Sequence, residues 1–262
     1  MKKNPKIIIN LSVYNSYKNL KKIIFGISSL KLNIVKIFII DNNSSNTIKQ
    51  KLSIIKKIKN LYKIRLKLII NKKNYGFGGS QKILFSQLKN EKFDYLVNLG
   101  TSGRYNIKSV MLDVKKNINS QRDYYLFSRF LNKKNIINYS KIRIIFNLIF
   151  ITITKVLTKT YFTDPGQSTY ILKKNIINKF SIIGVKNITN NSHFPHFFNI
   201  KIFKLNLNYK EIPILWKEGN IKSHLKPASY VLIFMFSVFK YFFTEEFFIE
   251  KNNKFKFKKF NF

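Results

Sequence analysis

The sequence predicts an α/β protein whose mostly parallel central sheet is covered by helices on both faces, followed by an apolar C-terminal helix. Two observations lead to this prediction. Short runs of apolar, β-forming residues alternate with helical stretches through the first half of the chain. The runs carry few polar interruptions, which is typical of strands buried on both faces. With 262 residues, 45% of them hydrophobic, the chain is long enough to bury such a core.

The expected elements follow this alternation in chain order. The strands are expected at residues 6–11, 35–40, 65–70 and 95–99. The helices that follow the first three strands are expected at about 18–30, 47–61 and 80–89. Ligands of such sheets bind beyond the carboxyl ends of the strands. Three polar segments fall at such ends, at residues 12–15, 41–45 and 100–105.

Two apolar stretches stand out in the less regular second half. Residues 142–157 form a helix candidate that is short and interrupted by charge. Residues 228–243 are almost entirely apolar and reach about 24 Å as a helix, which leaves a buried core helix or an in-plane or re-entrant membrane anchor as alternatives. The tail, residues 251–262, alternates Lys with Phe and could hold an anionic membrane surface or fray. We therefore divide the chain into a domain at 1–226 and a membrane-associating or packing segment at 227–262.

The charge of the chain is strongly unbalanced, with 49 Lys+Arg against 11 Asp+Glu and a formal net charge of +38. Such a charge attracts nucleic acid, anionic lipid or phosphorylated ligands. The lysines are spread along the whole chain together with many Asn, Ile and Phe, as an A+T-rich coding sequence would produce, and no nucleic-acid-binding motif stands out. We therefore expect no specific nucleic-acid partner. Cysteine is absent, which excludes disulfides and thiolate metal sites.

Polar motifs close the first three predicted strands. Residues 7–15 read IIINLSVYN, and residues 38–45 read FIIDNNSS. Asp41 in the second motif can accept hydrogen bonds from a nucleobase edge or a ribose hydroxyl, or can be a simple turn residue. Residues 71–81 read NKKNYGFGGSQ, where glycines allow close backbone approach and a helix N-terminus offers N–H groups to a phosphate.

Four later segments extend this series. Residues 95–105 read YLVNLGTSGRY, 126–130 read LFSRF, 163–170 read TDPGQSTY, and 210–219 read KEIPILWKEG, with Ser223, His224 and Leu225 following. In order and spacing, the motifs from residue 6 to 226 resemble those of the family 2 glycosyltransferases with the GT-A fold, a Rossmann-like architecture. The most similar branch uses polyprenyl-phosphate acceptors or builds surface polysaccharide.

This resemblance implies a nucleotide-sugar site and residues near the reacting centre. It assigns ten residues to nucleotide-sugar binding, namely Ser12, Tyr14, Asn15, Asp41, Asn74, Gly76, Ser102, Arg104, Arg129 and Lys217. The basic residues among them, together with Lys222, would approach the diphosphate. Asp164 is the candidate for an acceptor-positioning residue or base, and a plain Asp-Pro-Gly turn is the alternative. His196 is a second candidate base, and a packed histidine is the alternative.

One departure from the family pattern concerns its metal. The family holds Mg or Mn on the sugar diphosphate with an Asp-X-Asp pair, and Gly100 and Ser102 stand at those two positions. The chain contains no Asp-X-Asp sequence elsewhere, and these metals need several oxygen ligands with charge among them. Two alternatives follow. Lys and Arg side chains neutralise the diphosphate instead of a metal, or catalysis has been lost and binding retained.

The sequence thus predicts a hexosyltransferase of cell-envelope polysaccharide biosynthesis. It would move a sugar from a nucleotide diphosphate sugar to a lipid-linked (polyprenyl phosphate) or polysaccharide acceptor. The scarcity of acids favours a phosphate acceptor, which needs no base. No signal peptide is evident, and we expect a cytoplasmic protein, peripheral on the inner face of the cell membrane. The alternatives are a catalytically silent GT-A-like nucleotide-binding or partner-binding protein, and a basic nucleic-acid or membrane-surface binder.

Overall fold

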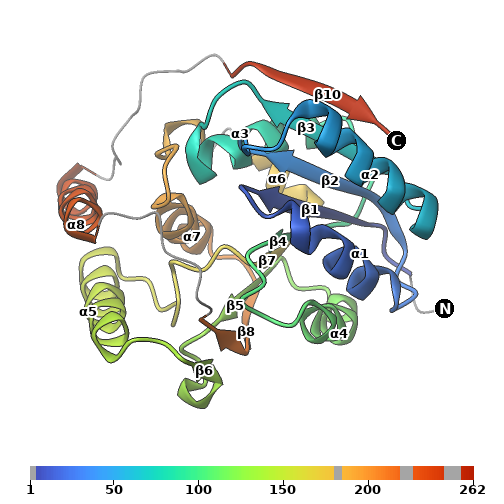
Figure 1. Cartoon of the computed structure of the whole chain (residues 1–262). Helices are drawn as coiled ribbons and strands as arrows, with labels where there is room; N and C mark the ends of the chain where they lie inside the picture. Colours follow the sequence, from blue (N-terminus) through green and yellow to red (C-terminus); the bar gives the residue numbers. More distant parts are fainter. Residues whose placement is uncertain (1–3, 180–184, 219–226, 245–254) are drawn as a thin grey trace.

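An eight-stranded sheet forms the centre of the molecule (Figure 1). The computed structural model describes residues 4–179, 185–218, 227–244 and 255–262. In spatial order the strands are β10 (Phe257–Asn261), β3 (Leu66–Asn71), β2 (Ile34–Asp41), β1 (Ile7–Val13), β4 (Tyr95–Gly100), β7 (Tyr170–Lys173), β5 (Tyr124–Ser128) and β8 (Tyr209–Pro213). A second, two-stranded sheet pairs β6 (Ile136–Ile137) with β9 (Trp216–Lys217).

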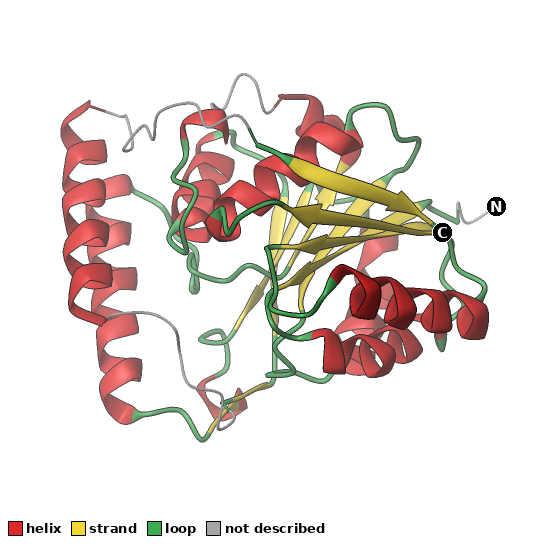
Figure 2. Ribbon diagram, turned by 45° about the horizontal axis from the view of Figure 1, so that its top comes forward, coloured by secondary structure: helices red, strands yellow, loops and turns green. Residues whose placement is uncertain are grey.

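Helices cover both faces of the central sheet (Figure 2). One face carries α1 (Leu20–Ser28), α2 (Ile48–Tyr62) and α4 (Ile107–Asn117), and the other carries α3 (Gly76–Leu88), α6 (Lys174–Asn178) and α7 (Phe194–Lys204). Two longer helices, α5 (Lys141–Thr158) and α8 (Pro227–Thr244), lie together at the side of the molecule. Short 3-10 turns occupy Tyr17–Asn19, Ile118–Ser120, Lys133–Asn135 and Val185–Asn187. The predicted α/β architecture is confirmed.

The strand directions agree with the prediction of a mostly parallel sheet. β3, β2, β1 and β4 are parallel neighbours, as are β5 and β8, whereas β7 and β10 run antiparallel to the strands beside them. Val13 pairs with Asp41, and Ser12 pairs with Gly100. The carboxyl ends of β1, β2 and β4 therefore meet at one edge of the sheet, which brings the three predicted polar segments together.

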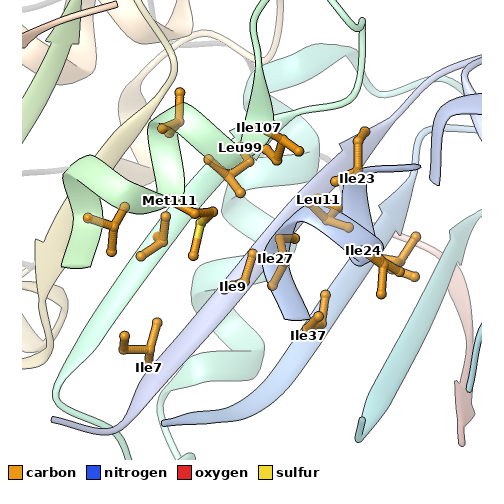
Figure 3. Packing of buried hydrophobic residues seen from close by; sticks show 14 of the residues in the cluster. Ile7, Ile9, Leu11, Ile23, Ile24, Ile27, Ile37, Leu99, Ile107 and Met111 are labelled. Carbon is orange, nitrogen blue, oxygen red and sulfur yellow. The ribbon is translucent and has the colours of Figure 1, made fainter. Parts of the chain in front are cut away.

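Strand β1 divides its side chains between the two faces. Ile7, Ile9 and Leu11 pack against α1 and α4 in one apolar cluster (Figure 3). Ile8 belongs to the cluster on the α3 side, as the two-residue period of a strand requires. Asn10 follows Ile8 on that second face and is fully buried. A polar side chain enclosed in this way needs hydrogen-bond partners, and these belong to the site described below.

Helix α3 begins at Gly76 and not at the expected residue 80. Its first turn is the glycine-rich segment that the sequence suggested as a loop. Gly78 and Gly79 donate their backbone N–H groups to the carbonyl oxygens of Asn191 (3.3 Å) and Asn190 (3.1 Å). A Cβ atom on Gly78 would lie 2.3 Å from the carbonyl oxygen of Thr189. These glycines therefore admit another segment of this chain, which occupies donors that were expected to meet a phosphate.

The C-terminal region joins the rest of the fold. Phe257 and Phe260 of β10 pack against the two apolar clusters, so this part of the tail is an edge strand and not a frayed end. The inward side of α8 contributes Phe234 and Val238 to the core beside α7. No helix in the described ranges is long and apolar enough to cross a membrane. The division expected between residues 226 and 227 borders a stretch outside the described residues.

Candidate functional site

Asp41 lies at the end of β2, where the sequence places a nucleoside-binding carboxylate, but its side chain is fully buried. One carboxylate oxygen forms an ion pair with Nζ of Lys51 at 2.7 Å. The other accepts hydrogen bonds from the backbone N–H (3.0 Å) and the hydroxyl (2.5 Å) of Ser44. In this arrangement Asp41 holds the turn after β2 in place, and its oxygens have no surface to offer a ligand.

The turn that Asp41 holds is tied to the turn after β1. Asn15 donates its backbone N–H to the hydroxyl of Ser44 (2.8 Å), and its side-chain oxygen accepts from the N–H of Ser45 (2.9 Å). Asn15 is exposed, and Tyr14 beside it is 43% exposed. Asn74 is exposed as well, and its side-chain oxygen accepts from Asn42 at 2.6 Å. The structure thus brings Tyr14, Asn15 and Asn74 to the accessible side of this edge.

A buried amide network lies behind these turns and was not singled out in the sequence. The side-chain oxygen of Asn98 on β4 accepts from Nδ2 of Asn10 (2.7 Å) and from Nε2 of Gln81 (3.2 Å). Gln81 also donates to the hydroxyl of Ser12 (3.1 Å) and accepts from the Tyr170 hydroxyl (3.0 Å). The signal in the sequence was a polar residue in each of two otherwise apolar strands. Through this network Ser12 is fixed between the sheet and α3.

The end of β4, where the resembled family binds its metal, offers few ligands here. Gly100 has no side chain, and its backbone N–H and carbonyl oxygen both bond to the Tyr105 hydroxyl, at 2.7 and 3.0 Å. Ser102 offers a neutral hydroxyl, whereas Mg or Mn requires charged oxygen ligands. Within the described part of the chain, no group of three His, Cys, Asp or Glu side chains could hold a metal ion. The residues at this position do not fit a divalent metal site.

Beyond this strand end, basic, acidic and aromatic side chains gather around one tryptophan. We define the arginine–tryptophan cluster as the following five residues: Arg104, Arg129, Asp164, Trp216 and Glu218. The guanidinium groups of Arg104 and Arg129 lie 5.8 and 5.3 Å from the Trp216 ring, within the range of cation–π attraction. Glu218 pairs with Arg104 at 3.0 Å and accepts from the indole N–H at 3.2 Å. The two predicted phosphate-binding arginines therefore share one site.

Asp164 and Arg129 were predicted separately, and the structure pairs them. The Arg129 guanidinium donates from Nε to one carboxylate oxygen of Asp164 (2.7 Å) and from its terminal nitrogen to the other (2.8 Å). The Arg129 backbone N–H adds a third bond at 3.0 Å. A two-point pair of this kind fixes both planes, and Asp164 is nearly fully buried. Its carboxylate is thus committed to orienting Arg129 in this state.

Two further phosphate candidates stand in different positions. Lys217 on β9 is exposed, and its backbone N–H donates to the carbonyl oxygen of Arg104 at 2.7 Å. Its strand therefore borders the arginine–tryptophan cluster. Lys222 lies outside the described residues, as do Ser223, His224 and Leu225.

His196 packs at the start of α7 against the turn that follows Asp164. A Cβ atom on Gly166 would lie 2.5 Å from the imidazole Cε1, and the Phe234 ring of α8 lies 4.8 Å away. Burial, then the nearby charges of His193 and Arg129, lower the pKa of His196 from 6.5 to about 3. The imidazole is therefore neutral at physiological pH and is a weak base, which disfavours the predicted role in deprotonating an acceptor.

This pKa predicts an acid-sensitive stability that depends on His196. Below pH 6.5 the unfolded chain binds a proton at this residue, and the folded chain binds it only below about pH 3. The free energy of unfolding should therefore fall by about 1.4 kcal/mol between about pH 7.5 and about pH 5.5 through this group. Urea titrations of the wild type and His196→Gln at both values test this. An unchanged pH dependence in the variant would contradict it.

Glu211 in β8 appeared in the sequence only as part of a motif without a role. Its carboxylate accepts hydrogen bonds from the backbone N–H (2.9 Å) and hydroxyl (2.8 Å) of Thr163, next to Asp164. Burial raises the pKa of Glu211, and the hydrogen bonds from Thr163 oppose this shift. The sequence signal that could have identified Glu211 was the scarcity of acids, because the chain contains only 11 Asp and Glu residues. Glu211 supports the turn that carries Asp164.

Comparisons with known proteins bear on the fold of this chain. No protein-family model matches the sequence, and no curated protein matches it either. Among solved structures, glucosyl-3-phosphoglycerate synthase from Mycobacterium tuberculosis, in complex with Mn²⁺, uridine diphosphate and glucosyl-3-phosphoglycerate, superposes with a TM-score of 0.59 and 9% identity. This match covers 98% of the present chain and 87% of that chain.

A second similar structure is residues 1–349 of TarS from S. aureus. Its TM-score is 0.55 at 15% identity, and the match covers 92% of the present chain and 73% of that one. Identities this low are evidence for the fold and for no further property. Together with the mostly parallel sheet and its two helical layers, these matches show that the chain has the GT-A fold.

Proposed function

We propose that this chain transfers a hexose from a nucleotide diphosphate sugar to a lipid-linked acceptor, with a polyprenyl phosphate as the first acceptor class and a surface polysaccharide as the second. The acceptor oxygen would attack the anomeric carbon. The bond from that carbon to the diphosphate would break, and its electron pair would leave with the nucleoside diphosphate. A phosphate oxygen is already deprotonated, so this acceptor needs no base from the chain. An acceptor that needs no base suits a site in which His196 is a weak base and Asp164 is already paired.

One observation carries the proposal. Nε of Arg104 is buried and has no hydrogen-bond partner within the described ranges. A buried donor without an acceptor costs about 1–3 kcal/mol, and an anionic phosphate oxygen would satisfy it. Arg104 follows Ser102 by two residues, at the strand end where the resembled family holds its sugar diphosphate. The proposal therefore assigns the diphosphate to Arg104 and Arg129, with Ser102 and Lys217 at its border.

The same residues would replace a metal. The synthase from M. tuberculosis was solved with Mn²⁺ and uridine diphosphate, but the donor set at Gly100 and Ser102 does not fit such an ion. Two guanidinium groups oriented by Asp164 and Glu218 would instead stabilise the charge that develops on the leaving diphosphate. Charge stabilisation of this kind needs donors held in place beforehand, and the ion pairs of the arginine–tryptophan cluster hold them.

The nucleoside would lie at the edge formed by the turns after β1 and β2. Tyr14, Asn15 and Asn74 are its exposed residues. Asp41 would contribute indirectly, because it holds the turn after β2 in place. Ser12 and Gly76 would shape the floor of the site through the amide network and the start of α3. We place this activity at the cytoplasmic face of the cell membrane, in the synthesis of envelope polysaccharide.

A thermal-shift screen tests the donor site. Uridine and guanosine diphosphates and their sugar conjugates would be added to the purified chain, with Mn²⁺ or with EDTA. We expect at least one nucleotide to raise the midpoint of unfolding, by an amount that EDTA leaves unchanged because the arginines and not a metal bind the diphosphate. No shift with any nucleotide would refute the proposal, and a shift that EDTA abolishes would refute its metal-free part.

A catalytically silent nucleotide-binding protein is the second candidate. The buried, paired state of Asp164 favours it over transfer to a polysaccharide hydroxyl, which would need a base. Incubation with a nucleotide sugar and a short polyprenyl phosphate separates the two candidates. The first requires a glycosylated lipid and free nucleoside diphosphate in equal amounts. The second requires binding without either product.

A further inference from the structure

Helices α5 and α8 lie side by side, away from the central sheet (Figures 1 and 2). Each has 18 residues and spans about 27 Å. They contact one another through Phe150 and Phe234, whose ring centroids are 5.0 Å apart. Neither helix is long and apolar enough to cross a membrane.

Helix α5 exposes large apolar side chains as well as burying some. Its buried positions are Ile151, Thr154 and Thr158, and the Thr158 hydroxyl bonds back to the Thr154 carbonyl oxygen at 2.6 Å. The exposed side chains include five large apolar ones, Ile142, Ile145, Phe146, Ile149 and Val156. A surface helix normally buries its apolar stripe and exposes polar groups. Here Phe150, Ile153 and Leu157 pack against the core, and a second apolar stripe points outward.

Helix α8 likewise has an outward apolar stripe in addition to its buried apolar side. Ser237 is buried between Phe234 and Tyr241, which are buried as well. Among the side chains of α8 that the structure describes, the large apolar ones that are exposed are Leu232, Phe236, Phe239, Phe242 and Phe243. We call the ten outward side chains of α5 and α8 the two-helix face. Exposed apolar side chains that recur along two adjacent helices form a patch of the kind found at interaction sites.

The charges around the two-helix face indicate what it contacts. Residues 141–158 and 227–244 contain no Asp or Glu, and Glu245 and Glu246 follow directly after α8. Lysines occur within these helices or directly after α5, namely Lys141, Lys155, Lys159 and Lys240. A second copy of this chain would bring the same positive charges, and a total of +38, against them. An anionic lipid surface is complementary to both the charge and the apolar stripe.

We propose that the two-helix face docks in the plane of an anionic bilayer, with its apolar side chains in the boundary between headgroups and acyl chains. Lys141 and Lys159 would lie at the level of the headgroups, where their ammonium groups can meet lipid phosphates. The proposal concerns two helices that act together, because α5 and α8 lie side by side at one side of the molecule.

Docking of this kind would bring the site close to the lipid. On the inward side of α8, the ring centroids of Phe234 and His196 are 4.8 Å apart. His196 in turn packs on Gly166, which is two residues after Asp164. The turn that carries Asp164 therefore sits directly behind the two-helix face. For the lipid-linked acceptor this inference rests on the proposed function, whereas the docking itself requires no sugar transfer.

Vesicle flotation tests the docking. The purified chain would be mixed with vesicles of phosphatidylcholine alone or with about 30% phosphatidylglycerol. We expect the wild type to float with the anionic vesicles and to bind the neutral ones at least about tenfold more weakly. The double variant Val156→Glu/Phe243→Glu places two carboxylates on the face, at side chains that are 69% and 78% exposed. It should bind anionic vesicles at least about tenfold more weakly than the wild type.

A matched variant controls for the added charge. Phe25 and Leu61 are each 60% exposed, on α1 and α2, and Phe25→Glu/Leu61→Glu should float like the wild type. Equal binding by both double variants, or no binding of the wild type, would overturn the inference. A lipid-free dimer that only Val156→Glu/Phe243→Glu dissociates, in sedimentation experiments, would assign the face to a second copy instead. Vesicle binding without any nucleotide shift would leave the docking intact and refute the proposed function.

Discussion

Replacing Asp41 with Asn should lower the free energy of unfolding by about 3–5 kcal/mol. The substitution keeps the shape of the side chain but leaves the ammonium group of Lys51, which is 3% exposed, without its counter-charge. A buried charge without a partner carries its full desolvation cost. Urea unfolding at neutral pH, followed by circular dichroism, measures the loss directly.

A second substitution tests whether the loss of stability comes from the ion pair or from a change in the shape of the turn. Lys51→Met removes the other charge, and the double variant Asp41→Asn/Lys51→Met leaves no buried charge. Because replacing both members of a buried pair is often neutral, the double variant should be more stable than Asp41→Asn alone. If the losses of unfolding free energy in the two single variants add up in the double variant, the ion pair is not the origin of the effect.

Arg104→Ala should lower kcat/KM for sugar transfer by about 10²–10³-fold. The reason is the loss of a guanidinium that would stabilise charge on the leaving diphosphate, in a site without metal ligands. The measurement is the steady-state release of nucleoside diphosphate in the presence of the lipid acceptor. Arg104→Lys should recover only part of the activity, because an ammonium group cannot reproduce the planar set of donors.

Arg143 provides the control for this prediction. It pairs with the same carboxylate oxygen of Glu218 at 3.4 Å but is far more exposed, at 48% against 23% for Arg104. Arg143→Ala removes an equal charge from the same partner and should change kcat/KM by less than about threefold. Equal losses in both variants would trace the effect to Glu218 or to net charge.

Local sequence signals predicted the first half of the fold well. Continuous apolar runs identified β1 to β4. Thr47, where the second helix was expected to begin, is the N-cap of α2, and its reciprocal capping bonds with Gln50 stabilise the helix start. The start of α3 was placed too late because glycines are poor helix formers. Here they are retained since the chain at Thr189 approaches too closely for any side chain. Because Gly78 and Thr189 are far apart in the sequence, no local sequence pattern predicts their contact.

The sequence predicted which residues belong to the site but not which of them pair with one another. The motifs identified Arg129 and Asp164 separately, and only the tertiary structure shows that each satisfies the other. The burial of Asp41 was equally invisible, because its partner Lys51 is one of many lysines in the sequence. The amide network of Asn10, Gln81 and Asn98 joins three elements. Pairings of this kind depend on topology, which the motifs do not encode.

The pairing of β10 with β3 has a consequence for the synthesis of this chain. β10 follows β3 by roughly 190 residues, so a ribosome completes β1 to β4 long before it makes the strand that covers the β3 edge. During that interval the backbone N–H and C=O groups of β3 are open to any other nascent strand. Lys72 and Lys73, just after β3, place positive charge at the end of this edge. Electrostatic repulsion between nascent chains would thus protect the growing protein from aggregation.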